Sequence, residues 1–248
     1  MLHRSLRLAS AILVSSTIAF ATAAAQAAKP DTAKPLKVTA GLAYLDASGN
    51  TDVTSLTVNE RLEWTRPHFV WAQSANAING STDGEESANL LAIGLRGDWK
   101  PRGRLSVYGL VNYDRNRFAN IGRRFEEGAG LGYTLIERPR HKLATELGAQ
   151  FVQQRNLDKV SDSFLAGRAA ELYRFTFREN TYFEERVELL PNLEENKDYR
   201  MNGEASLVAP LSKHLSLKLG YVVRFDNLPE SGVKKTDRFL TSGLQVAF

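Results

Sequence analysis

The sequence predicts an all-β protein, built as a single antiparallel transmembrane β-barrel of about twelve strands. Apolar and polar residues alternate with a period of two through most of the chain, which is the pattern of a strand with one apolar face. Short breaks rich in Gly, Pro, Asn and Asp separate the alternating runs. Beyond the N-terminus no stretch approaches the roughly 18 to 20 apolar residues that a spanning helix needs.

The N-terminus predicts export from the cytoplasm. Arg4 and Arg7 precede an apolar stretch, which ends in the small-residue pattern Ala25-Gln26-Ala27. No Cys follows this site, so a lipoprotein is excluded, and the many Ser and Thr residues of the stretch argue against a membrane anchor. We expect a signal peptide at residues 1–27, a short periplasmic leader at 28–35 and the barrel at 36–248.

The composition excludes several classes of site. The chain has no cysteine, which removes disulfides, thiolate catalysis and cysteine metal sites. Its formal charge of +4 includes Arg4 and Arg7 of the signal peptide, and the rest carries no basic block, so we expect no nucleic-acid partner. We also expect no cofactor and no metal site.

Six runs predict the first half of the barrel. In the second run Trp64 lies on the face opposite Arg61 and Glu63, and the other runs divide in the same way. Turn-forming residues such as Gly49 and Pro67 occupy the breaks. The six runs span residues 36–45, 55–66, 69–78, 89–99, 105–113 and 125–135, with long polar breaks predicted at 79–85 and 115–124.

Six further runs predict the second half. The eleventh is the clearest, because Leu217 and Tyr221 lie opposite Lys218 and Arg224. The six runs span residues 143–153, 164–175, 183–189, 199–209, 215–225 and 240–248.

The final run ends in an aromatic residue. Leu240, Leu244, Val246 and Phe248 share one face, and this pattern resembles the C-terminal recognition strand of bacterial outer-membrane barrels. The resemblance implies that these four residues form an assembly signal. A terminal strand on a soluble core would show the same apolar face, so ordinary packing is the alternative.

Break lengths and tryptophans predict the orientation of the barrel. Breaks after odd-numbered runs are mostly longer than those after even-numbered runs, as in barrels with short periplasmic turns, which places both termini in the periplasm. Trp64, Trp71 and Trp99 all lie beside the short breaks, where an interfacial aromatic belt would sit. Core packing is the alternative for each of them.

Charged residues occupy the face opposite the apolar one, so a membrane barrel would place them in its lumen. We expect them to form an interior network of ion pairs, with catalysis by paired carboxylates as the weaker alternative. Glycines of the same face, such as Gly130 and Gly132, are expected to ease strand curvature. The predicted lumen charges are Arg61, Glu63, Glu146, Glu184, Arg186, Arg200, Glu204, Lys218 and Arg224, together with Glu126, Glu171 and Arg174.

Short motifs extend the resemblance to a family. The chain carries Gly49-Asn50-Thr51, Gly130-Leu131-Gly132-Tyr133, Phe225-Asp226-Asn227 and Lys235-Thr236-Asp237, and with them it resembles the family called domain of unknown function 481. That family includes proteins described as salt-induced outer-membrane proteins. The resemblance implies a barrel in the bacterial outer membrane, surrounded by its lipid and delivered by periplasmic chaperones and the barrel-assembly machinery, and it implies no catalytic residue.

Three functions remain open. The first is a structural or stress-related barrel with a narrow charged lumen; the second is a diffusion pore for small polar solutes; the third is a soluble periplasmic ligand-binding barrel with its charged face in water. About twelve strands would leave that third barrel a lumen too wide for its apolar side chains to fill. We expect no enzyme, because His68, His141 and His214 all lie at short breaks assigned to the periplasmic side.

Overall fold

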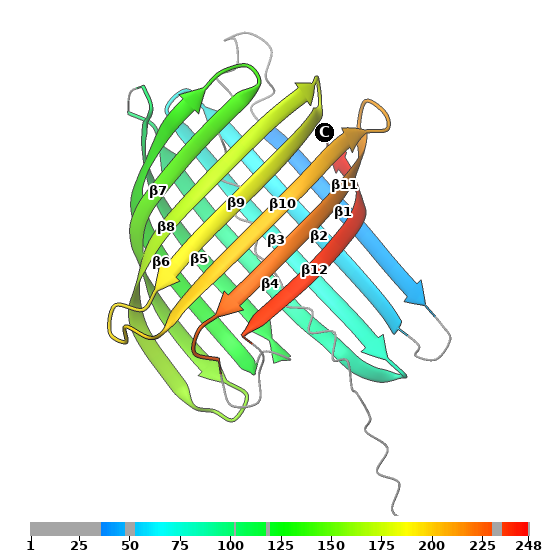
Figure 1. The fold of residues 1–248 in the computed structure, drawn as a ribbon, viewed down its shortest axis with the longest axis vertical. Helices are drawn as coiled ribbons and strands as arrows, with labels where there is room; N and C mark the ends of the chain where they lie inside the picture. The colour runs from blue at the N-terminus through cyan, green and yellow to red at the C-terminus, as the bar shows by residue number, and fades with distance from the viewer. Residues whose placement is uncertain (1–35, 48–52, 102, 118–119, 230–234, 248) are drawn as a thin grey trace, which may run out of the picture.

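The alternating runs form one closed β-barrel. The computed structural model describes residues 36–47, 53–101, 103–117, 120–229 and 235–247, and each strand pairs antiparallel with its neighbours in the chain. Strand β1 also pairs with β12, so the sheet closes on itself (Figure 1). The predicted all-β antiparallel barrel of about twelve strands is therefore confirmed. The strands are β1 Leu36–Ala47, β2 Val53–Arg66, β3 Phe69–Thr82, β4 Glu85–Trp99, β5 Leu105–Asn116, β6 Ile121–Glu137, β7 His141–Asn156, β8 Ser161–Arg178, β9 Thr181–Pro191, β10 Tyr199–Pro210, β11 Leu215–Asp226 and β12 Thr236–Ala247.

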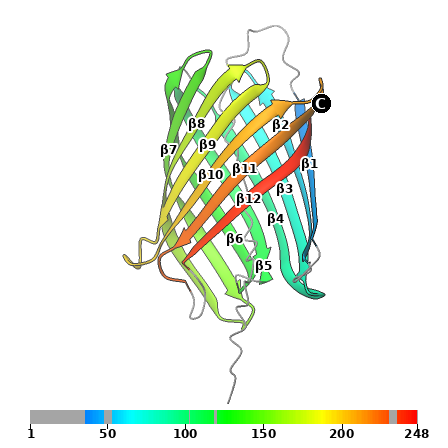
Figure 2. The same ribbon diagram turned by 45° about the vertical axis from the view of Figure 1, so that its right-hand side comes forward.

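The seam between the first and last strands is the shortest pairing in the barrel. Among the described residues, strands β1 and β12 pair from Thr39 opposite Ala247 to Leu42 opposite Leu244. By contrast, β1 pairs with β2 along its whole length. Figure 2 shows β1 and β12 side by side where the sheet closes. The described part of the chain contains no helix with the length and apolarity of a transmembrane helix.

The two ends of the barrel differ in their connections. Only residues 67–68 and 179–180 link β2 to β3 and β8 to β9, and we call this the tight-turn end. Residues 192–198 and 227–235 link β9 to β10 and β11 to β12 at the opposite end, the long-loop end. Strand β1 begins and β12 finishes at the tight-turn end, because Leu36 pairs with Trp64 and Ala247 pairs with Thr39.

Several connections at the long-loop end are shorter than the sequence indicated. The predicted break at 79–85 is wrong, since β3 continues to Thr82 and β4 begins at Glu85. Only Asp83 and Gly84 lie between them, both with positive φ, as a tight two-residue hairpin turn requires. The predicted break at 115–124 is shortened in the same way, because β6 already begins at Ile121. Near this end of the barrel the strands carry polar residues on both faces. The alternation of apolar and polar residues is therefore lost, and such a strand end looks like a loop in the sequence.

The inner face of the wall is partly apolar. Small and medium apolar side chains are buried there between the charged ones, and Val152, Phe164 and Ala166 form one cluster. Alternate residues of the same strands expose large apolar side chains on the outside, such as Leu147 at 68% and Leu131 at 55%. The outer surface of this barrel is thus more apolar than a water-facing surface would be.

Candidate functional site: the charged lumen

All but one of the predicted lumen charges lie on the inner face of the barrel. Their side chains are buried or half-buried, although they alternate with exposed apolar residues. Several of them form ion pairs between strands that are not neighbours in the sheet, which only side chains inside the barrel can do. The residues placed in this way are Arg61, Glu63, Glu146, Glu184, Arg186, Arg200, Glu204, Lys218 and Arg224, with Glu126 and Arg174.

One predicted lumen charge is placed wrongly. Glu171 is exposed and lies on the outer face of β8. Arg168 and Arg174 point inward from the same strand, and Glu171 is an odd number of residues away from each of them. Because side chains of a strand alternate between its faces, Glu171 cannot share their face.

The middle of the lumen holds five charged side chains that we call the middle cluster: Arg96 and Asp98 from β4, Glu146 from β7, Arg168 from β8 and Glu188 from β9. Arg96 donates to both carboxylate oxygens of Asp98, from Nε at 2.8 Å and from Nη2 at 2.6 Å. Glu146 accepts from Arg96 Nη2 at 2.8 Å through Oε1 and from Arg168 Nη1 at 2.7 Å through Oε2. Arg168 Nε donates to Glu188 Oε1 at 2.6 Å.

The middle cluster is almost completely removed from water. The side chains of Arg96 and Arg168 are each 2% exposed and that of Glu146 is 8% exposed. Charges this deeply buried are stable only when they are paired and hydrogen-bonded, and here each carboxylate faces at least one guanidinium group. The cluster therefore ties β4, β7, β8 and β9 together across the interior.

Tyr108 of β5 fills the space between the two arginines of the middle cluster. Its ring lies 4.4 Å from the Arg96 guanidinium carbon and 5.1 Å from that of Arg168, and its hydroxyl accepts a hydrogen bond from Arg168 Nη1 at 2.8 Å. Gly130 and Gly148 provide the room, since a Cβ on either would lie within 2.5 Å of the tyrosine hydroxyl oxygen. These inward glycines thus accommodate a side chain, a role the sequence did not suggest.

A second group lies toward the long-loop end, and we call it the mouth cluster: Glu126 of β6, Arg200 and Asn202 of β10, and Arg224 of β11. Its one arginine–carboxylate pair is longer than those of the middle cluster. Arg200 Nη1 lies 3.9 Å from Glu126 Oε1, and the Arg200 guanidinium carbon lies 5.7 Å from the Phe164 ring. Arg224 Nη1 donates to Asn202 Oδ1 at 2.8 Å.

Other ion pairs lie on the inner wall toward the tight-turn end. Arg174 pairs with Glu184, and Lys218 Nζ lies 2.9 Å from Glu204 Oε1. The Lys218 side chain is 37% exposed, so water enters this part of the lumen further than it enters the middle cluster. Arg61 pairs with Glu63 at 3.3 Å between Nη2 and Oε2.

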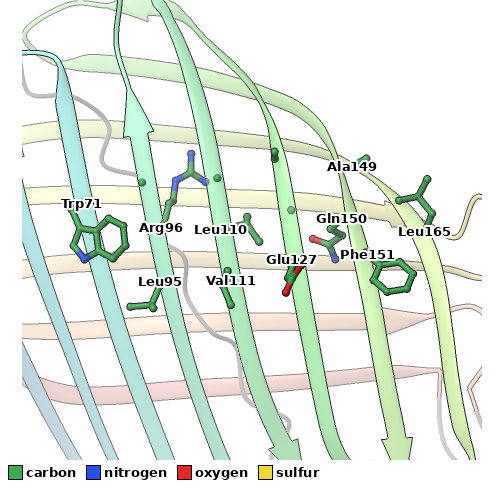
Figure 3. A pocket seen from close by; sticks show the side chains of 14 residues that line it. Trp71, Leu95, Arg96, Leu110, Val111, Glu127, Ala149, Gln150, Phe151 and Leu165 are labelled. Atoms are coloured by element: carbon green, nitrogen blue, oxygen red, sulfur yellow. The ribbon is translucent and has the colours of Figure 1, made fainter.

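The outer face carries the three tryptophans and a shallow groove. Trp64, Trp71 and Trp99 are exposed near the tight-turn end, and Trp64 pairs directly with Trp71 across β2 and β3. A groove of about 670 Å³ runs along the outer surface from Trp71. Trp71, Leu95, Val111, Glu127 and Phe151, from successive strands β3 to β7, line it in one row (Figure 3).

The proposed assembly residues are described only in part. Leu244 is 47% exposed on the outer face, and Val246 is half-buried and pairs with Ala40 in the seam. Phe248 and the side chain of Leu240 lie outside the described residues, as does the predicted signal peptide at 1–27.

The predicted lumen charges include only Glu146 of the five middle-cluster residues. Arg96, Asp98, Arg168 and Glu188 were not predicted, and neither was the contact with Tyr108. Parity within each strand was the available signal: Arg168 lies six residues from Arg174 and Glu188 two from Arg186, while Arg96 and Asp98 alternate with the apolar Leu95 and Trp99. Which of them contact one another depends on the register between strands.

The remaining chemistry of the described residues is sparse. His68, His141 and His214 all lie at the tight-turn end, and His141 Nδ1 is 2.9 Å from the Tyr173 hydroxyl. Within the described ranges no three His, Asp or Glu side chains are grouped to hold a metal ion.

Comparison with known proteins gives a family and a fold. The family described as "Protein of unknown function, DUF481" matches residues 38–248. "Uncharacterized protein YdiY" of Escherichia coli (strain K12) is 27% identical over 212 residues, which cover 85% of this chain and 82% of that protein.

Solved structures with the same fold are outer-membrane barrels. The translocator domain of the autotransporter NalP from Neisseria meningitidis has a TM-score of 0.53 at 11% identity, covering 88% of this chain and 90% of that one. The NanC porin has a TM-score of 0.52 at 9% identity, covering 86% of this chain and 97% of that one. At these identities the likeness shows the barrel fold alone.

Proposed function

The chain belongs to the family described as "Protein of unknown function, DUF481", and from this premise we propose that it is a bacterial outer-membrane barrel with a structural or stress-related role, whose lumen is closed to steady ion flow. The single observation that carries the closed lumen is the middle cluster. Side chains that are 2% exposed cannot line a water-filled channel, so water does not run continuously past Arg96 and Arg168. A barrel of this strand number is also narrower than the 16 to 18 strands that leave a wide aqueous channel.

The apolar outer surface supports the membrane location. Exposed Leu, Val and aromatic side chains surround the barrel, and the tryptophans gather near one end, as in the aromatic girdles of membrane barrels. The same surface argues against a soluble periplasmic barrel. The orientation we propose places the tight-turn end, where β1 begins and β12 finishes, in the periplasm.

Planar-bilayer recording tests the closed lumen. We expect silence or brief openings from the wild-type barrel after its insertion is confirmed by heat-dependent electrophoretic mobility. The variant Arg96→Ser combined with Arg168→Ser removes two long side chains from the middle cluster and should produce a measurable conductance. Arg104→Ser, which changes an arginine at the surface of the β4–β5 connection, is the matched control and should remain silent. Steady ohmic current from the wild type would refute the closed lumen.

The second candidate is a diffusion pore for small polar solutes. Charged side chains of both signs line the lumen, and one structure with the same fold is a porin. Under this function the wild type conducts, and changing Arg186 or Arg224 to Ala alters the conductance. The bilayer experiment therefore separates the two candidates.

The end of the chain is proposed to direct assembly. Leu240, Leu244, Val246 and Phe248 share one parity, and we propose that the assembly machinery recognises this strand after periplasmic chaperones deliver the chain. Deleting Phe248 should lower the amount of assembled barrel far more than deleting Ala28, which precedes the barrel. Equal yields would assign Phe248 to packing alone.

We propose no enzymatic activity. The three histidines at the tight-turn end are far from the opposite mouth, where a lipid-modifying barrel would meet the outer leaflet. Lipid deacylation by the purified barrel that disappears on changing His68, His141 or His214 to Ala would contradict this.

A further inference from the structure

Three buried guanidinium nitrogens of the mouth cluster have no hydrogen-bond acceptor among the described residues. They are Nε and Nη2 of Arg224 and Nη2 of Arg200. Both arginines lie on the inner wall at the long-loop end, and Arg200 and Arg224 are diagonal neighbours, because Arg200 pairs with Asp226 and Asn202 pairs with Arg224. Buried donors are normally satisfied, so unsatisfied ones often mark the position of a water molecule or an ion.

The unpaired nitrogens of Arg224 form one edge of its guanidinium group. Nε and Nη2 point in the same direction and together match the two oxygens of a carboxylate. Arg96 uses this same edge to hold both oxygens of Asp98, and Arg174 uses it to hold Glu184. Arg124 donates with it to Gln154 Oε1. Arg224 thus leaves unused the edge with which Arg96, Arg174 and Arg124 bind an oxygen acceptor.

No acidic side chain among the described residues accepts a hydrogen bond from this edge of Arg224. Asn202 holds Arg224 Nη1 through Oδ1 and donates from Nδ2 to Glu188 Oε2 at 3.2 Å, while Glu188 is already paired with Arg168. Glu126 remains 3.9 Å from Arg200. Asn112 Oδ1, on the strand next to Glu126, is buried without a donor among the described residues, so an acceptor accompanies the donors.

We propose that the long-loop end of the lumen contains a binding site for an oxyanion, the carboxylate or phosphate group of a small polar solute. The Nε and Nη2 edge of Arg224 binds two oxygens of the group, and Arg200 Nη2 binds a further one. Asn112 accepts a hydrogen bond from a hydroxyl group of the same solute. The solute enters from the long-loop end past the Arg200 side chain, which lies 3.9 Å from Glu126 and against the Phe164 ring and shifts to let the solute reach Arg224.

Isothermal titration calorimetry on the folded barrel in detergent tests this site at constant ionic strength set with chloride. Gluconate supplies a carboxylate with hydroxyl groups, inorganic phosphate supplies the other oxyanion, and sorbitol is the neutral control. We expect saturable binding of one oxyanion per barrel and none of sorbitol. Binding of gluconate alone, of phosphate alone or of both identifies the oxyanion source. Binding of neither overturns the proposal.

Variants separate recognition from general attraction of charge. Arg224→Gln should weaken binding by about tenfold or more, since it removes charged hydrogen bonds. Arg224→Lys retains the charge but loses the two-pronged edge, so its binding should also be clearly weaker than that of wild type. Arg174→Gln, whose guanidinium edge is already occupied by Glu184, should bind as wild type does.

A second variant keeps the test decisive if Arg224 variants do not fold. Arg200→Gln removes the other donor, and its weakened binding would support the same site. Unchanged affinity in both Arg200→Gln and Arg224→Lys would overturn the assignment to these residues. Calorimetry tests the oxyanion site and bilayer recording tests the closed lumen, so either proposal can fail without the other.

Discussion

The middle cluster and the mouth cluster contain the same kinds of side chain but differ in how well these are paired. In the middle cluster Arg96 and Arg168 meet carboxylate oxygens at 2.6–2.8 Å. In the mouth cluster, by contrast, Arg200 Nη1 lies 3.9 Å from the carboxylate oxygen of Glu126. The first arrangement holds strands together and leaves one nitrogen, Arg168 Nη2, without an acceptor among the described residues, whereas the second leaves three.

Space and register explain this difference. Gly130 and Gly148 let Tyr108 occupy the middle of the lumen, where it stacks against both arginines and keeps them beside Glu146. At the mouth cluster the hydrogen-bond partner of Arg224 is the neutral Asn202, whose amide oxygen takes only one nitrogen of the guanidinium group. Burial of similar charges therefore produces a rigid tie in one place and a binding surface in the other.

Removing the central carboxylate of the middle cluster should have the largest effect on stability. Glu146→Gln leaves Arg96 and Arg168 buried with one charge partner fewer each, and we expect the free energy of unfolding to fall by about 3 to 5 kcal/mol. Urea unfolding in detergent or lipid vesicles, followed by tryptophan fluorescence, measures the change.

Glu63→Gln is the control for this loss of charge. Glu63 pairs with Arg61 at 3.3 Å, and their side chains are 24% and 19% exposed, so we expect a loss of about 1 kcal/mol or less. If both substitutions lowered the free energy of unfolding equally, the middle cluster would not stabilise the barrel more than an ordinary half-buried ion pair.

Filling the space beside Tyr108 should have a moderate effect. A Cβ at Gly130 would lie 2.3 Å from the Leu147 carbonyl oxygen and 2.5 Å from the Tyr108 hydroxyl, and the backbone oxygen cannot move aside. Gly130→Ala should therefore cost about 1 to 3 kcal/mol in the same unfolding experiment.

Gly203→Ala, near the mouth cluster, is the control for Gly130→Ala. Gly203 lies in β10 beside Asn202, and an added Cβ there would have no described atom within 4 Å. Its effect should stay within about 0.5 kcal/mol. A comparable loss from both alanines would show that strand glycines matter here for backbone freedom and not for the space that Tyr108 occupies.

The sequence predicted the wall of the barrel better than its contents. Period two assigned residues such as Trp64 and Arg61 to opposite faces correctly, because the two faces meet different environments and every strand repeats that contrast. It failed at Glu171, where a charge on the outer face was assigned to the lumen, and at 79–85, where strands continue beyond the apolar band.

The alternation of residues in the sequence could not predict which side chains meet across the lumen. Arg96 and Glu146 are 50 residues apart, and their meeting depends on the register of every strand from β4 to β7. That register includes shifts between Ile121 and Arg123 and between Thr134 and Ile136, which no alternation pattern reveals. The middle and mouth clusters therefore look alike in the sequence, although only one is tightly paired.

A small effect on stability is also expected from changing the acid of the mouth cluster. Glu126 lies 3.9 Å from Arg200 and accepts a 3.3 Å hydrogen bond from Asn112 Nδ2, which the amide oxygen of Gln can also accept. Glu126→Gln should therefore change the free energy of unfolding by less than about 1 kcal/mol, in contrast to the same substitution at Glu146.

The same substitution should strengthen oxyanion binding at the mouth cluster. Glu126 forms an ion pair with Arg200 at 3.9 Å, so it competes electrostatically with an incoming carboxylate or phosphate. Its removal should tighten the binding of the oxyanion several-fold, by roughly 1 kcal/mol or less, while the barrel keeps its stability. Calorimetry with gluconate and phosphate measures the gain, and the urea midpoint of the same sample reports stability. Weaker binding would mean that Glu126 holds Arg200 in its binding position, and a large loss of stability would remove the distinction between the two clusters.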